Sequence, residues 1–144
     1  MQHIQVRRAT YKDAPTIKLL LETTDYKTSM SLLIEQIESV FDGKNNELLV
    51  CVSQLEIIAF AEVHYLEQLI ERGGLAIVCF FATNDSSGQQ GTAELLEGHV
   101  CKAASERKCT AVKICDHFNQ KLASEFYVKQ GYMPSGNTYL KKII

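Results

Sequence analysis

Apolar and polar residues alternate along the chain in patterns that predict a succession of strands and helices. Strict alternation over a few residues indicates a strand, and apolar residues spaced three or four apart indicate a helix. A short strand at 4–8 precedes two helices. The first helix follows a capping-box pattern from Thr10 to Asp13, and the second carries an apolar stripe from Met30 to Phe41. Gly43 is the predicted stop of the second helix.

The rest of the chain is predicted to hold three strands, a helix, a strand, a helix and a last strand or hairpin. Their ranges are 47–53, 57–65, 75–83, about 91–107, 110–115, 120–129 and 132–143, with a turn at 134–137. The strand at 75–83 is almost wholly apolar, as expected of a central strand covered on both faces. This order predicts one α/β domain, residues 1–144, with a mixed sheet between helices.

Composition excludes several classes of protein. The 144 residues are 46% hydrophobic and 22% charged, which is ordinary for one globular domain. A net charge of −2 gives no electrostatic case for nucleic acid or an anionic membrane as a partner. No apolar run approaches the roughly 20 residues of a membrane span, and the N-terminus lacks an apolar signal core, so we expect a cytoplasmic protein. The five cysteines show no CxxC spacing, which favours reduced thiols and argues against zinc.

A polar, glycine-containing segment at 84–90 joins the apolar strand to the helix that begins near Gly91. A helix N-terminus directs unpaired N–H groups and the positive end of its dipole toward one point, which suits a phosphate group. Gly88, Gly91 and Ala93 are small enough to let a ligand approach the main chain. Taken alone, this stretch favours the simpler interpretation of a turn that its glycines permit, because one glycine pair is a weak signal.

Three motifs together point to one superfamily. The loop reads Gly88-Gln89-Gln90-Gly91-Thr92-Ala93, the later helix reads Ala123, Phe126, Tyr127, Lys129, Gly131, Tyr132 in the pattern A-x-x-F-Y-x-K-x-G-Y, and the N-terminus reads Val6-Arg7-Arg8-Ala9-Thr10 with Asp13. With the element order, these motifs resemble the GNAT superfamily of acyl-CoA-dependent N-acyltransferases over nearly the whole chain. In the family the loop is [RQ]-x-x-G-x-[GA], so Gly88 stands where Arg or Gln is usual.

The resemblance implies a three-layer α-β-α fold whose mixed, largely antiparallel sheet has about six to seven strands and splays at an acyl-CoA cleft. It implies acetyl-CoA as co-substrate and no metal. The pantetheine arm would pair with the main chain of Phe81, Ala82 and Thr83 as an added strand. The loop from Gly88 through Gln89, Gln90, Gly91 and Thr92 to Ala93 would hold the pyrophosphate, and Asn119 lies near the position of a further family contact.

The resemblance also implies the catalytic groups. Tyr127 matches the tyrosine that protonates the leaving thiolate, and a phenol of pKa near 10 suits that role. The alternative for Tyr127 is a core aromatic residue paired with Phe126. The strand at 75–83 has no carboxylate, whereas many family members place a glutamate base there. Glu62 and His64 share one face of the neighbouring strand, and His64 is the better base. They serve equally well as the polar face of a half-exposed strand, and a water chain could also act as base.

The leading prediction is an N-acetyltransferase that moves acetyl directly from acetyl-CoA to a primary amine of a small molecule or a protein. A second prediction is a catalytically degenerate, GNAT-like sensor or assembly protein that binds CoA, which Gly88 and the missing strand carboxylate favour. A third is an unrelated nucleotide-binding module with a preference for ATP or NAD. A homodimer is also possible, because the final strands of this family often pair between subunits.

Overall fold

A computed structural model describes residues 4–23, 26–70, 72–83, 91–115 and 121–143 of the chain. Its strands are β1 (Ile4–Arg8), β2 (Asn46–Ser53), β3 (Glu56–Glu67), β4 (Gly74–Thr83), β5 (Cys109–Cys115), β6 (Met133–Ser135) and β7 (Thr138–Lys142). Its helices are the short 3₁₀ helix η1 (Tyr11–Asp13), α1 (Ala14–Glu22), α2 (Met30–Asp42), α3 (Thr92–Glu106) and α4 (Lys121–Lys129). The order of these elements confirms the one that the sequence predicts.

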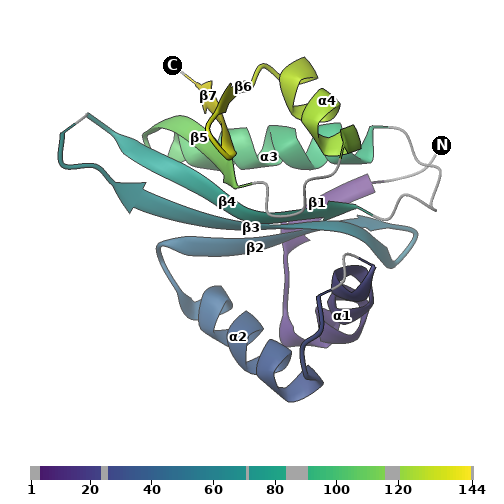
Figure 1. Cartoon of the computed structure of the whole chain (residues 1–144). Coiled ribbons are helices and arrows are strands. Elements are labelled where there is room, and N and C mark those ends of the chain that lie inside the picture. The colour runs from purple at the N-terminus through teal and green to yellow at the C-terminus, as the bar shows by residue number, and fades with distance from the viewer. Residues whose placement is uncertain (1–3, 24–25, 71, 84–90, 116–120, 144) are drawn as a thin grey trace.

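The strands form one seven-stranded sheet in the order β1-β2-β3-β4-β5-β7-β6. Strands β4 and β5 run parallel, and the other neighbouring pairs are antiparallel. Helices α3 and α4 lie on one side of the sheet, and α1 and α2 lie on the other (Figure 1). The predicted mixed sheet between two helical layers is therefore confirmed.

Each face of the sheet has its own hydrophobic core. Leu96, Val100 and Ala104 of α3 pack on alternate residues of the central strands, such as Val63 and Val78. On the other face, residues of α1 and α2 pack on the intervening strand positions. The helix residues of this core include Ile17, Leu20 and Ile37, and its strand residues include Val50, Phe60 and Ala82. The two cores follow from the alternation of side chains across a strand.

The N-terminal segment and α2 are held by local polar contacts that the sequence pattern anticipates. The Thr10 N–H donates to Oδ2 of Asp13 at 2.8 Å, the second half of the predicted capping box. Arg7 makes two hydrogen bonds to the same carboxylate, at 2.8 and 3.0 Å. Helix α2 begins after Ser29, whose Oγ accepts from the Leu32 N–H, and it ends before Gly43 as predicted.

Strands β4 and β5 pair along only part of their length. Their register ends at Val78 and Ile114, whereas β4 continues to pair with β3 as far as Thr83. The main chain of residues 80–83 therefore pairs with β3 on one side, and the described pairing with β5 does not reach it. The β4–β5 ladder thus stops short of the end of β4, at the place where the family resemblance implies that the two strands part.

A β-bulge in β4 sits at the same place. Glu62 of β3 pairs with Phe80 and Val63 pairs with Val78, so Cys79 is an extra residue. The extra residue reverses the alternation of side chains along the rest of β4. Val78 packs in the core beneath α3, Phe80 packs on the opposite side, and Phe81 returns to the α3 side.

Two sequence predictions about strands need correction. The turn of the last hairpin is at Gly136 and Asn137, because Pro134 lies within β6 and Ser135 already pairs with Thr138. Strand β4 is central, as predicted, but its Leu75 and Ile77 are only half-buried. An apolar run in the sequence therefore does not show that a strand is covered on both faces of the sheet.

Candidate functional site

Tyr127 of α4 lies beside the point where β4 and β5 separate. Its side chain is 5% exposed. Its ring centre lies 6.3 Å from that of Phe81, on the part of β4 that β5 no longer accompanies. It also lies 5.1 Å from the ring centre of Tyr139, which pairs with Ile114 at the end of the β4–β5 ladder. These ring contacts place Tyr127 between β4 and β7, next to the end of the β4–β5 ladder.

The N-terminus of α3 is the second component of the predicted site. The helix begins after Gly91, whose φ of +90° is in the left-handed region, and a Cβ there would meet no atom within 4 Å. Ser29 caps α2, whereas no side chain within the described ranges caps α3. Its first turn therefore offers backbone N–H groups to a bound anion.

The predicted coenzyme contacts fall partly within the described residues. Phe81, Ala82 and Thr83 lie on the unaccompanied end of β4, and Gly91, Thr92 and Ala93 begin α3. The remaining predicted contacts lie outside the described residues. They are Gly88, Gln89, Gln90 and Asn119. The assignment of these residues to coenzyme binding stays a prediction.

Glu62 and His64 lie together, but on the face of the sheet opposite Tyr127. Nε2 of His64 is 2.8 Å from Oε2 of Glu62, and the two side chains are about one-third exposed, at 34% and 36%. Their neighbours Ala61 and Val63 pack in the same core as Tyr127, so alternation along β3 turns Glu62 and His64 to the other face. The predicted acid and base are therefore on different sides of the sheet.

Two thiols occupy the strands at the parting. Cys79 and Cys115 directly follow the last paired residues, Val78 and Ile114. Burial, with added effects of Glu62 and Cys115, raises the pKa of the Cys79 thiol to about 11. Because the thiolate is the nucleophilic form, Cys79 is a poor nucleophile at neutral pH. All five cysteines are free thiols.

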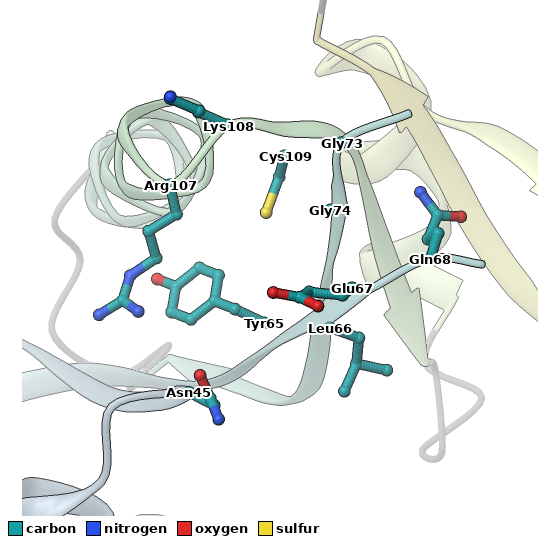
Figure 2. Close-up of a pocket in the computed structure, with 10 residues that line it drawn as sticks. All are labelled: Asn45, Tyr65, Leu66, Glu67, Gln68, Gly73, Gly74, Arg107, Lys108 and Cys109. Atoms are coloured by element: carbon teal, nitrogen blue, oxygen red, sulfur yellow. The ribbon is translucent and has the colours of Figure 1, made fainter. Parts of the chain in front are cut away.

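A separate cavity of about 450 Å³ lies at the opposite end of the β4–β5 ladder (Figure 2). The Arg107 guanidinium lies over the Tyr65 ring, with its carbon 4.1 Å from the ring centre, and it also forms a 3.4 Å ion pair with Glu47. The Tyr65 hydroxyl donates to Glu47 at 2.7 Å, and burial together with this bond raises the pKa of Tyr65. Arg107, Tyr65 and Glu47 already bind one another. We therefore interpret this cavity as part of the packing between α3 and β3, and not as a ligand site.

The described residues show neither a metal-binding cluster nor a membrane-spanning helix. Among them, no three His, Cys, Asp or Glu side chains gather in the manner of a metal site. Nor does any helix within the described ranges have the length and apolar character needed to cross a bilayer.

No protein-family model and no curated protein sequence matches this chain. Solved structures do resemble it. A transcriptional regulator from Bacillus halodurans has 21% identity and a TM-score of 0.84, over 92% of this chain and 95% of its own. The PaiA N-acetyltransferase from Thermoplasma acidophilum, solved with coenzyme A, has 15% identity and a TM-score of 0.77, over 97% and 99%. A GNAT-family acetyltransferase from Streptococcus pneumoniae has 14% identity and a TM-score of 0.75, over 96% of each chain.

Proposed function

We propose, from the premise that this chain has the GNAT acetyltransferase fold, that it transfers an acetyl group from acetyl-CoA to a primary amine. The observation that carries the proposal is the early end of the β4–β5 ladder at Val78 and Ile114, with the Tyr127 ring beside it. A thioester bound along this end of β4 would bring its leaving sulfur, which needs a proton, near the Tyr127 phenol.

The described residues fit a coenzyme with a diphosphate and an amide-containing arm. Residues 79–83 of β4 can pair with the amides of the arm as a further strand would. The N-terminal turn of α3 would face the diphosphate, and the open space at Gly91 lets it approach. The coenzyme A in the structure of the PaiA acetyltransferase supports this proposal.

The reaction needs one proton removed and one supplied. The neutral amine attacks the thioester carbonyl carbon, the C–S bond breaks, and the CoA thiolate leaves. In our proposal the Tyr127 hydroxyl donates its proton to that sulfur, and His64, hydrogen-bonded to Glu62, removes a proton from the amine. Because the two groups lie on opposite faces of the sheet, the acceptor would enter from the Glu62–His64 side.

The test is acetyl-CoA turnover with a panel of amines, comparing the native chain with Tyr127→Phe. We expect kcat to fall about 100-fold, a typical contribution of a general acid, while CoA affinity in calorimetry stays unchanged. Tyr139→Phe is the matched control, because Tyr139 contacts the Tyr127 ring at 5.1 Å and has no proposed proton role. Full activity of Tyr127→Phe would remove the proton donor from the mechanism.

A CoA-binding protein without catalysis is the second candidate. The observation in its favour is that β4 carries no carboxylate between Gly74 and Thr83. Calorimetric binding of CoA, without acetyl transfer to any amine of the panel, would favour this candidate.

A further inference from the structure

One row of side chains crosses the sheet on the face opposite α3. The strand registers align the residues of this row from β3 to β6. They are His64, Ile77, Lys113, Leu140 and Met133. Their neighbours Val63, Val78 and Ile114 are buried beneath α3, so the row itself faces the other way. None of the five is fully buried, which leaves this part of the face accessible.

A cavity of about 420 Å³ opens on this face beside Lys113. Its polar lining consists mainly of cations and hydroxyl groups. They are Arg72, Lys113, Lys142, Thr110, Ser135 and Thr138. Among the described residues that line the cavity there is no Asp or Glu. An anion entering it would meet charged and hydroxyl donors, and no carboxylate among the described lining residues would oppose it.

The three cations are not neutralised elsewhere in the described part of the chain. No ion pair there involves Arg72, Lys113 or Lys142. The neighbouring Lys141 differs, because its Nζ lies 2.8 Å from the buried Glu97 on the other face. Strand β7 thus directs one lysine to a buried carboxylate and the next lysine to the cavity. Uncompensated cations around a concave surface attract an anionic group.

The cavity reaches the point where β4 and β5 separate. Lys113 directly precedes Ile114, the last residue of the ladder, and Thr138 pairs with Cys115 just beyond it. His64 lies in the same row two strands away, which is about 10 Å at the usual strand spacing. A molecule on this face could therefore place an amine near Glu62 and His64 and an anionic group near Lys113.

We propose that the acceptor is a small amine that carries a carboxylate or phosphate group, and that Lys113 and Lys142 bind this group. The inference rests on the proposed acetyl transfer and names its class of acceptor. A cavity of this volume suits a small molecule. The Glu62–His64 pair faces the amine end, and the cations fix the other end, so an amine with the opposite charge pattern, such as a polyamine, binds poorly.

Paired acceptors test the proposal. O-phosphoethanolamine is compared with ethanolamine, and β-alanine with propylamine, since each pair differs in its anionic group, and spermidine supplies the cationic case. We expect the native chain to prefer the anionic member of at least one pair. Lys113→Met should then raise KM for that acceptor about 10-fold or more, with KM for acetyl-CoA unchanged, and Lys113→Arg should restore most of it. Lys102→Met, an exposed change on α3, is the control and should leave both values unchanged.

Direct binding separates this proposal from acetyl transfer itself. Calorimetry of O-phosphoethanolamine and β-alanine without coenzyme should show binding that Lys113→Met weakens, even if the chain transfers no acetyl group. Loss of CoA binding with retained anion binding would contradict the proposed enzyme and support the anion site. A preference for neutral or cationic amines, or anion binding that Lys113→Met leaves intact, would overturn the inference.

Discussion

Removing the ammonium group of Lys141 should leave the buried carboxylate of Glu97 without its charged partner. Glu97 of α3 is 3% exposed, and its Oε1 lies 2.8 Å from Nζ of Lys141 on β7. Cys101 adds a weak donor, with its sulfur 3.2 Å from the same oxygen. Lys141→Met keeps most of the apolar stem and removes the charge, so the variant tests the ion pair rather than the packing.

The expected cost follows from this burial. Breaking a buried ion pair from one side typically costs about 3–5 kcal/mol, because the remaining charge loses its partner without regaining water. The Lys141 side chain is 26% exposed, which lets some water reach the site, so we expect about 3 kcal/mol. For a chain of this length that loss corresponds to a Tm lower by roughly 10 °C.

Urea unfolding followed by circular dichroism measures the loss. Lys142→Met is the matched control, because it changes the adjacent residue, which has no described ion-pair partner, and should shift the free energy of unfolding by less than about 0.5 kcal/mol. The double variant Lys141→Met with Glu97→Gln removes both charges and should recover most of the loss. Equal stability of the native chain and Lys141→Met would refute the reasoning, as would a double variant no more stable than the single one.

The pH dependence has a definite sign. Burial acts to lower the pKa of Lys141, but its hydrogen bond to Glu97 and the attraction between their charges outweigh it, so the pKa lies above its ordinary value. The stability that this shift contributes is present below the pKa of the unfolded chain, near 10.4, and is lost as the pH rises through the folded value. The difference between the native chain and Lys141→Met should therefore shrink at strongly alkaline pH.

Two further predictions concern the N-terminal ion pair and the start of α3. Burial opposes ionisation of Asp13, but hydrogen bonds from Arg7 and from the Thr10 N–H lower its pKa overall. Arg7→Met should therefore lower the free energy of unfolding by about 1 kcal/mol at pH 7. The Tm values of variant and native chain should converge as the pH falls below 4 and through the folded pKa of Asp13. Gly91→Ala should lower the free energy of unfolding by about 1–2 kcal/mol because the φ of Gly91 is +90°, and calorimetry should show weaker CoA binding. Gly98→Ala inside α3 is the control and should be neutral or stabilising. Equal behaviour of the two variants would contradict this role of Gly91.

The sequence predicts local features well because they depend on neighbouring residues. The apolar stripe from Met30 to Phe41 predicts the helix that the structure shows as α2, which ends at Asp42, before Gly43. Alternation placed Glu62 and His64 on one face, where the structure pairs them at 2.8 Å. Both inferences needed only the periods of a helix and a strand.

Features that depend on strand register are not readable from the sequence in this way. The cavity beside Lys113 arises because β7 returns along β5 and brings Lys142 opposite Ala111. Glu97 and Lys141 meet across 44 positions of sequence. No local pattern distinguishes Lys141 from Lys142, although the sheet directs them to opposite faces.

Because of the bulge at Cys79, the alternation of side chains between the two faces shifts by one residue partway along β4. This limits which insertions and deletions the protein can accept. A residue gained or lost between Val78 and Phe80 would turn Phe80 and Phe81 to the opposite faces of the sheet, so each large ring would meet the wrong core. An insertion or deletion in the tip between β3 and β4, where Leu69 and Ile70 are fully exposed, would leave the alternation on both sides of the bulge unchanged. Natural variation in length should therefore collect in the tip, and the strand should keep its residue count even where its residue types drift.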